Sequence, residues 1–219
     1  MILAAEIGPP VLIILAGPNG AGKSTLYRNE LQDRYRSLEF INPDELAMRH
    51  FGHAAQTLEE SRKGQHLADA RREALMAANQ SFITESTFSH LSKLELLQQA
   101  QAAGYRVFVY HVNVQSPTLS VLRVAHRVSQ GGHPVPEDKI RGRYERNQQL
   151  IRQAVIRADR AYVFDNSMAA QPHRLALEFR AGLIDIVHSQ PTPWMLSLYA
   201  HEIEAFTQTE QPPRPRHKG

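Results

Sequence analysis

One stretch near the start of the chain, VLIILAGPNGAGKST (residues 11–25), constrains the fold more than any other part of the sequence. Six apolar residues, enough for a buried strand, lead into a glycine-rich turn that fits the pattern GxxxxGK[S/T] in every fixed position. A helical pattern follows directly. Strand, glycine turn and helix in this order form a loop that binds nucleotide phosphates, so we expect a nucleoside triphosphate site here.

The glycine-rich turn also predicts which groups hold the nucleotide. Glycines let the backbone turn tightly enough for its amides to face the phosphates, and the helix that follows adds its positive amino terminus. We expect Lys23 to reach the β- and γ-phosphates and Ser24 to ligate Mg²⁺. The predicted nucleotide-binding residues are Gly17, Pro18, Asn19, Gly20, Ala21, Gly22, Lys23, Ser24 and Thr25.

The rest of the chain alternates short apolar runs with helical periodicity. Because parallel strands need a crossover connection that a helix supplies, this alternation predicts an α/β fold with a doubly wound, parallel five-stranded sheet. The predicted strands are residues 11–16, 38–41, 81–84, 105–112 and 161–164. The predicted helices are residues 23–35, 44–51, 58–78, 90–103, 117–129 and 137–158.

The end of the chain predicts a β-hairpin and a closing helix. Residues 174–188 alternate apolar and polar side chains around Ala181 and Gly182, which indicates the hairpin. Residues 194–206 then show helical periodicity. We treat residues 1–207 as a single P-loop domain and residues 208–219, which are rich in proline and charge, as a disordered tail.

Composition excludes several classes of protein. The chain has no cysteine, which excludes disulfides and thiolate metal sites. No apolar run approaches the roughly 18 residues of a membrane span, so we expect a cytoplasmic protein with no membrane partner. The net charge is only +3, and the basic residues of 123–160 are spread along predicted helices, so anionic partners are favoured but nucleic acid is not.

Polar side chains follow two of the predicted strands, where ligands collect in open α/β sheets. Asn42 and Asp44 follow the second strand, and Asp44 is open to two interpretations, a cap of the next helix or a group of the site. Glu85, Thr87 and Ser89 follow the third strand, and the last two are also possible caps. A carboxylate at the tip of a buried strand is costly unless it meets a metal, a cation or a hydroxyl. Glu85 is therefore a candidate for substrate or Mg²⁺ binding.

Two basic helices joined by a glycine corner predict a lid over residues 123–147. Arg127 lies before Gly131 and Gly132, and Arg143 lies in the second helix. Closure of such a lid brings arginines over the phosphates, where a planar guanidinium stabilises charge on the transferring phosphoryl group. His133, in the corner, is interpreted as a turn or packing residue rather than a catalyst.

Asp165 ends an apolar run in the way that the Mg²⁺-binding strand of many ATPases does. As the fifth run it is expected toward a sheet edge, away from Lys23, in a loop near the nucleotide base. The chain lacks the guanine-selecting motif Asn-Lys-x-Asp, which favours ATP over GTP.

Taken together, these segments resemble the zeta toxin family, P-loop kinases of bacterial toxin–antitoxin systems. The resemblance covers residues 11–166 and is strongest in the short zeta-like proteins. Besides the phosphate loop it rests on NPDE, FITESTFS, RVSQGGHPVPEDKIRGRYERN and ADRAYVFDNS, which begin at residues 42, 82, 127 and 158.

The resemblance implies a reaction, a partner and roles for residues. It implies transfer of the ATP γ-phosphoryl group to a sugar hydroxyl of UDP-N-acetylglucosamine or a related UDP-sugar, and a small helical antitoxin that blocks the phosphate loop. It implies Asp44 as the general base, with Glu85 and Thr87 holding the substrate and Arg127 and Arg143 as lid arginines. Larger zeta toxins have an arginine where this chain has Ser89, so their UDP-sugar contacts do not simply transfer.

Two other functions stay open from the sequence. One is a P-loop kinase of another hydroxylated small molecule or of a nucleic-acid end, although aromatic residues, at 7%, do not interleave with the arginines as a single-strand channel requires. The other is a non-catalytic ATP-binding regulatory module. The carboxylates at two strand ends and the arginines of the lid count against it.

Overall fold

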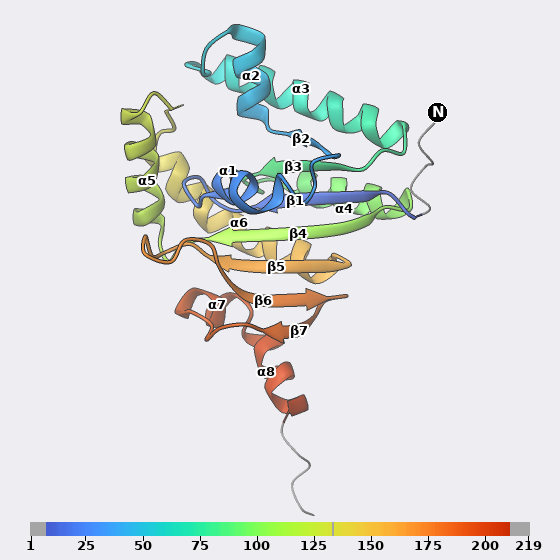
Figure 1. The fold of residues 1–219 in the computed structure, drawn as a ribbon. Helices are drawn as coiled ribbons and strands as arrows, with labels where there is room; N and C mark the ends of the chain where they lie inside the picture. The colour runs from blue at the N-terminus through green and yellow to red at the C-terminus, as the bar shows by residue number, and fades with distance from the viewer. Residues whose placement is uncertain (1–7, 133, 211–219) are drawn as a thin grey trace, which may run out of the picture.

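The computed structural model describes residues 8–132 and 134–210, which form a seven-stranded sheet between helices (Figure 1). The strands are β1 (Val11–Ala16), β2 (Glu39–Ile41), β3 (Phe82–Ser86), β4 (Arg106–Asn113), β5 (Arg160–Asp165), β6 (Arg174–Arg180) and β7 (Leu183–Val187). The α-helices are α1 (Lys23–Leu26), α2 (Pro43–Phe51), α3 (Leu58–Ala77), α4 (Ser92–Ala102), α5 (Pro117–Ser129), α6 (Glu137–Arg157), α7 (Pro193–Leu198) and α8 (Ala200–Glu210).

The sheet has the strand order β2-β3-β1-β4-β5-β6-β7. The first five strands in this order are all parallel, so the predicted doubly wound parallel sheet of five strands is confirmed. The predicted hairpin is β6 and β7, and it extends the same sheet in antiparallel fashion beyond β5. The whole sheet is therefore mixed.

Strand β1 is buried on both faces, which explains why its sequence is a continuous apolar run. Leu12 and Ile14 face a core that α3, α4, α6 and α8 complete. Ile13 and Leu15 face a smaller core under α1 and the segment that follows it. Burial of one such side chain stabilises the fold by about 1.5–3 kcal/mol, so this strand anchors both layers.

Three features differ clearly from the sequence prediction. The single closing helix predicted at residues 194–206 is two helices, α7 and α8, with Tyr199 between them. The helix predicted at 23–35 is α-helical only over α1, continues as a π-helical segment, η1 (Tyr27–Leu31), and then gives way to turns. Residues 208–210, which the sequence predicted as the start of a disordered tail, belong to α8, which continues to Glu210. Residues 211–219 lie outside the described residues, and so does His133.

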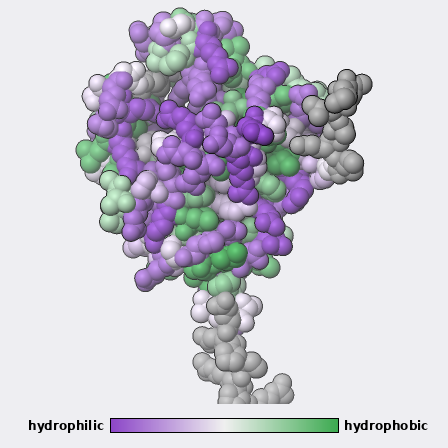
Figure 2. All heavy atoms as spheres, viewed as in Figure 1, coloured by the Kyte–Doolittle hydropathy of each residue, from purple (hydrophilic) through white to green (hydrophobic). Residues whose placement is uncertain are grey.

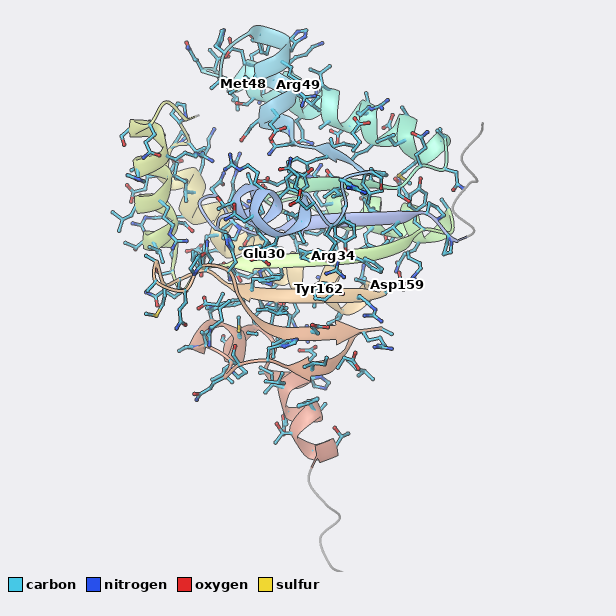
Figure 3. All side chains as sticks on the ribbon, viewed as in Figure 1. Glu30, Arg34, Met48, Arg49, Asp159 and Tyr162 are labelled. Carbon is cyan, nitrogen blue, oxygen red and sulfur yellow. The ribbon has the colours of Figure 1, made fainter. Side chains whose placement is uncertain are left out.

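Helices α2 and α3 pack closely beyond the β2 edge of the sheet. A Cβ on Gly64 of α3 would lie 2.8 Å from the Cβ of Ala47 on α2, so only glycine allows this approach. Met48 and Arg49 of α2 are exposed (Figure 3). Close packing of α2 on α3 thereby holds the start of α2 against the ends of the strands.

The surface in the view of Figure 2 is mostly hydrophilic, and apolar side chains gather in its lower part, over β6 and β7. Exposed residues of β7 include Leu183, Ile186 and Val187. In the described part of the chain, no helix combines the length and the apolar character that crossing a membrane requires.

A buried histidine ties β4 to the C-terminal helices. His111 is 0% exposed, and its Nδ1 shares a hydrogen bond of 2.8 Å with the hydroxyl of Tyr199. The indole of Trp194 packs edge-on against its ring. Burial lowers the pKa of His111 to about 3, so the folded protein keeps this imidazole neutral.

This burial predicts acid sensitivity. Below pH 6.5 the unfolded chain binds a proton at His111, whereas the folded chain binds it only near pH 3. The free energy of unfolding therefore falls as the pH falls from 6.5 to about 3. At pH 5 the loss from this residue is about 2 kcal/mol. In urea unfolding at a series of pH values, His111→Gln is expected to show a shallower fall than the wild type, and the exposed-site variant His201→Gln to follow the wild type. Parallel curves for His111→Gln and wild type would contradict this assignment.

Candidate active site

The predicted phosphate loop lies between β1 and α1, at the carboxyl end of the parallel strands (Figure 1). Gly20 and Gly22 have φ of +72° and +97°, which side chains rarely adopt. A Cβ on Gly17 would lie 2.0 Å from the carbonyl oxygen of Val112 on β4. The glycines of the motif are thus required by backbone conformation and by close packing on the neighbouring strand.

Lys23 is held inside this loop. Its side chain is only 6% exposed, and its Nζ donates to the carbonyl oxygen of Pro18 at 3.0 Å. Burial lowers the pKa of Lys23 and nearby Arg127 adds to that effect, whereas the carboxylates of Glu85 and Asp44 oppose it. The lysine is therefore surrounded by the charged groups that the sequence predicted for the site.

The Glu85 carboxylate lies at the centre of the site. Its Oε2 accepts hydrogen bonds from Ser24 Oγ at 2.7 Å and from Asn42 Nδ2 at 3.1 Å, and its Oε1 lies 3.6 Å from Lys23 Nζ. Three elements meet in this way, because Ser24 lies in the first turn of α1, Asn42 follows β2 and Glu85 is on β3. A partly buried carboxylate is tolerated here because it is paired with a cation and two donors.

Asn42 is the N-cap of α2, so the interpretation of Asp44 as the cap is wrong. The Oδ1 of Asn42 accepts from the backbone amides of Asp44 at 2.8 Å and Glu45 at 3.4 Å. An Asn side chain one residue before a proline at the first helical position does this efficiently. The exposed Asp44 carboxylate is left to line a cavity instead.

Thr87 and Ser89 line the same cavity. Their hydroxyls lie 3.4 Å apart, and Asn147 on α6 donates to the carbonyl oxygen of Thr87 at 3.0 Å. Helix α4 starts only at Ser92, with Leu91 as its N-cap, so neither residue caps it as the sequence had suggested. Both hydroxyls face open space rather than a helix end.

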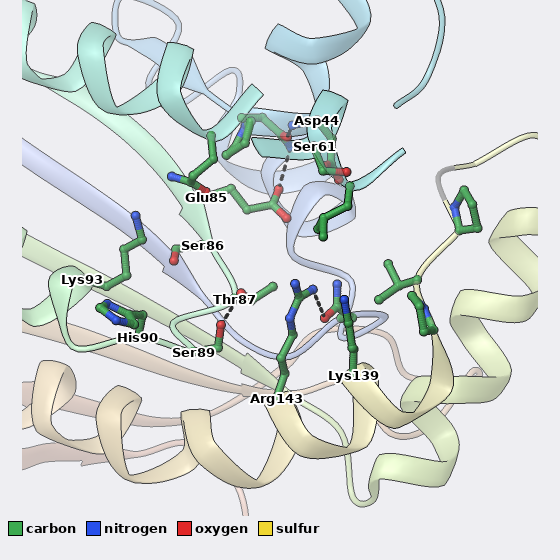
Figure 4. Close-up of a pocket in the computed structure, with 18 of the residues that line it drawn as sticks. Asp44, Ser61, Glu85, Ser86, Thr87, Ser89, His90, Lys93, Lys139 and Arg143 are labelled. Carbon is green, nitrogen blue, oxygen red and sulfur yellow. Dashed lines mark hydrogen bonds between the residues drawn. The ribbon is translucent and has the colours of Figure 1, made fainter. Parts of the chain in front are cut away.

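The cavity has a volume of about 750 Å³ and runs beside the phosphate loop. Figure 4 shows its walls: Asp44 and Glu85 on one side, Thr87 and Ser89 below them, and Arg143 at one end. Elements far apart in sequence, including α2, α3, β3, α4 and α6, contribute to it. A cavity of this size suits a ligand of drug-like size.

The two predicted lid arginines occupy different positions. Arg143 on α6 lines the cavity and its Nη1 donates to Oδ1 of Asn19 in the phosphate loop at 3.4 Å. Burial, and then neighbouring Arg146, lower the pKa of Arg143, while Asp44 opposes the shift. Arg127 is exposed on α5 but close enough to Lys23 to influence its pKa. Arg143 therefore contacts the phosphate loop, and Arg127, before the glycine corner, influences Lys23 through its charge.

Two residues that sequence reasoning missed support the phosphate loop from behind. Asn166 Nδ2 donates to the carbonyl oxygen of Ala21 at 2.8 Å, and its Oδ1 accepts from the amide of His173. The imidazole Nε2 of His173 lies 3.0 Å from the carbonyl oxygen of Gly22. The signal that could have found Asn166 is its position directly after a strand, as for Asn42.

Asp165 lies in the interior of the sheet, so the expectation that it lies toward an edge is wrong. Strands β6 and β7 continue the sheet beyond β5, and Asp165 is 4% exposed. Its Oδ1 accepts from Trp194 Nε1 at 3.0 Å, and Arg174 lies 3.7 Å from its Oδ2. The loop that follows it contacts the phosphate loop through Asn166 and His173, and Asp165 itself has a structural role.

The sheet order, the phosphate loop and the carboxylate beside it define a kinase-like P-loop phosphotransferase. The family model for zeta toxin matches residues 4–174, which is more than half of the chain, so the chain belongs to the zeta toxin family. An uncharacterized protein of Haemophilus influenzae (strain ATCC 51907 / DSM 11121 / KW20 / Rd) is 31% identical over 140 residues, which cover 60% of this chain and 91% of that protein.

Solved structures have the same fold. The AvrRxo1-ORF1:AvrRxo1-ORF2 complex with sulphate ions matches with a TM-score of 0.62 at 14% identity, over 95% of this chain and 66% of the matched chain. The same complex with ATP also has a TM-score of 0.62, at 15% identity, over 97% of this chain and 67% of that chain. The PezAT toxin–antitoxin system of Streptococcus pneumoniae matches with a TM-score of 0.57 at 15% identity, over 95% and 90% of the two chains. This chain thus spans about two thirds of the length of the matched AvrRxo1 chain.

The support behind the phosphate loop predicts a defect in nucleotide binding. Asn166→Ala removes a buried donor from the carbonyl of Ala21 and loosens His173, so the loop loses its fixed shape. We expect ATP affinity to fall about tenfold, which corresponds to about 1.4 kcal/mol. Isothermal titration calorimetry with ATP measures this. Met168→Ala, in the same loop at a side chain that is 62% exposed, should leave the affinity at the wild-type value, and equal affinity in all three proteins would remove the assigned role.

Proposed function

We propose that this protein is an ATP-dependent kinase that transfers the γ-phosphoryl group to a hydroxyl of a UDP-activated amino sugar such as UDP-N-acetylglucosamine. The observation that carries the proposal is the single cavity whose wall includes Asn19 of the phosphate loop, the carboxylates of Asp44 and Glu85, and the guanidinium of Arg143. Such a cavity can hold an acceptor hydroxyl next to the phosphates of ATP. The UDP-sugar as acceptor is supported by family membership.

The proposed reaction is an in-line displacement. Asp44 takes the proton from the acceptor hydroxyl as its oxygen attacks the γ-phosphorus. The bond from the γ-phosphorus to the β,γ-bridging oxygen breaks, and the electron pair leaves with ADP. The positive charges of Lys23, Arg127 and Arg143 stabilise the negative charge on the oxygens of the transferring group. This stabilisation is strongest in the transition state, so it accelerates the transfer.

Ser24 and Glu85 fit a Mg²⁺ ion. The Ser24 hydroxyl and the Glu85 carboxylate are 2.7 Å apart, and oxygen ligands of this kind are what Mg²⁺ prefers. Bound there, the ion would neutralise charge on the β- and γ-phosphates. Asn42 holds the carboxylate in place from the other side. Thr87 and Ser89 then offer hydroxyls to the acceptor along the cavity wall.

The proposal extends to regulation and location. The matched structures of AvrRxo1-ORF1 and PezAT are of a complex of two proteins and of a toxin–antitoxin system. We propose that this chain also has a protein partner, a small helical antitoxin that blocks the phosphate loop. A kinase that uses ATP as donor belongs in the cytoplasm.

Removal of the proposed base tests the mechanism. In Asp44→Asn the side chain keeps its shape but cannot accept the proton, so the transfer rate is expected to fall about 1,000-fold while ATP affinity stays unchanged. The matched control is Glu45→Gln, since Glu45 is the next residue of α2 and does not line the cavity. Transfer by Asp44→Asn at the wild-type rate would exclude this base.

A panel of acceptors tests the substrate. The protein is incubated with MgATP and separately with UDP-N-acetylglucosamine, other UDP-sugars, nucleosides and oligonucleotides, and the products are read by mass spectrometry. A mass gain of one phosphoryl group is expected on the UDP amino sugars. Phosphorylation of an oligonucleotide or a nucleoside, with the UDP-sugars unchanged, would exclude the proposed acceptor. Binding of ATP without transfer to any of the compounds would favour a regulatory module.

A further inference from the structure

The end of the cavity opposite Arg143 carries a second cationic group. Lys93, in the first turn of α4, lines this end together with Asp69 of α3. Figure 4 shows Lys93 and His90 across the cavity from Arg143 and Lys139. The reaction proposed above uses the other end, where the phosphate loop lies, so it leaves Lys93 without a role.

Lys93 is one of two cations that share a single carboxylate. Asp69 forms its closest contact with the guanidinium of Arg72, which is 3% exposed and also donates to Thr84 Oγ1 at 3.1 Å. The Nζ of Lys93 lies 3.5 Å from the same oxygen of Asp69, at the outer limit of a hydrogen bond. The cluster of Lys93, Asp69 and Arg72 therefore has a net charge of +1.

The surroundings of Lys93 favour a second anion. Its side chain is only 17% exposed, and burial and then Arg72 lower the pKa of Lys93, while Asp69 raises it. An ammonium group that is desolvated and repelled by a neighbouring guanidinium is stabilised by an additional negative charge. A salt bridge that served only to join α3 to α4 would not need its cation in the wall of a cavity, where Lys93 lies.

We propose that Lys93 binds a phosphate group of the acceptor and thereby selects acceptors that carry one. This inference rests on the proposed transfer to a hydroxyl acceptor in the same cavity. The acceptor then spans the cavity: its hydroxyl lies beside Asp44 and the phosphate loop, and its phosphate lies against Lys93. Lys93 is a binding residue, and it takes no part in the transfer itself.

Inorganic pyrophosphate is the probe that tests this site. The phosphate loop is first saturated with a non-hydrolysable ATP analogue in excess Mg²⁺, so that pyrophosphate cannot bind there, and calorimetry then measures pyrophosphate affinity. The wild type is expected to bind, and Lys93→Met to bind at least tenfold more weakly. Lys93→Arg keeps the charge and should retain binding. Lys63→Met, the same change at an exposed lysine of α3, should bind like the wild type.

A second variant shifts affinity in the opposite direction. Asp69→Asn removes the competing carboxylate and raises the net charge of the cluster to +2, so pyrophosphate should bind at least threefold more tightly. A purely structural salt bridge would not produce this gain, and thermal unfolding of each variant verifies the fold. Absence of binding to the wild type, equal binding by Lys93→Met, or no gain in Asp69→Asn would each overturn the inference.

These measurements involve no phosphoryl transfer, so they separate this inference from the proposed function. If pyrophosphate binds as expected but UDP-sugars are not phosphorylated, the anion site stands and the proposed acceptor is wrong. If UDP-sugars are phosphorylated but Lys93→Met binds pyrophosphate like the wild type, the function stands and the role of Lys93 is wrong.

Discussion

The arrangement of the site depends on one carboxylate, that of Glu85. It accepts from Ser24 and Asn42 and lies 3.6 Å from the ammonium group of Lys23. Lys23 and Ser24 lie at the start of α1 and Asn42 precedes α2, so one side chain on β3 fixes the relative positions of the phosphate loop, β3 and the start of α2. Breaking a buried charged cluster by removing one partner is costly, because the remaining charges lose their compensation.

The C-terminal third of the chain contributes to the site indirectly. The hairpin of β6 and β7 turns β5 into an interior strand, and the loop between β5 and β6 places Asn166 and His173 behind the phosphate loop. Asp165, which resembles a metal-binding aspartate in sequence, instead bonds to Trp194 and anchors α7. The nucleotide side of the site is thus supported by residues that follow it by more than a hundred positions.

The cavity is built differently from the phosphate loop. The phosphate loop is one continuous segment whose shape follows from its glycines, whereas the cavity draws its walls from α2, α3, β3, α4 and α6. The match to the zeta toxin family model runs over residues 4–174, so it includes both parts. Side chains at the far end, such as Lys93 and Ser89, are where a specificity particular to this chain can reside.

Local patterns in the sequence determined the elements and the class of fold. The glycine pattern of residues 17–25 predicts the phosphate loop because backbone conformation is a local property, and the alternation of apolar runs and helices predicts the five parallel strands. The same reasoning placed Asp44 and Glu85 at strand ends. It could not tell that Asn42 would be the cap of α2, because two polar residues in the same turn compete for that position.

Only the tertiary structure decided which groups meet. Strand β5 is an interior strand because the hairpin pairs with it. The sequence of the hairpin does not indicate which strand it pairs with. The partners of Glu85, the support from Asn166 and the sharing of Asp69 by two cations join residues far apart along the chain. Such contacts are set by packing of the whole core, whereas turns, caps and periodicity are set by neighbours in sequence.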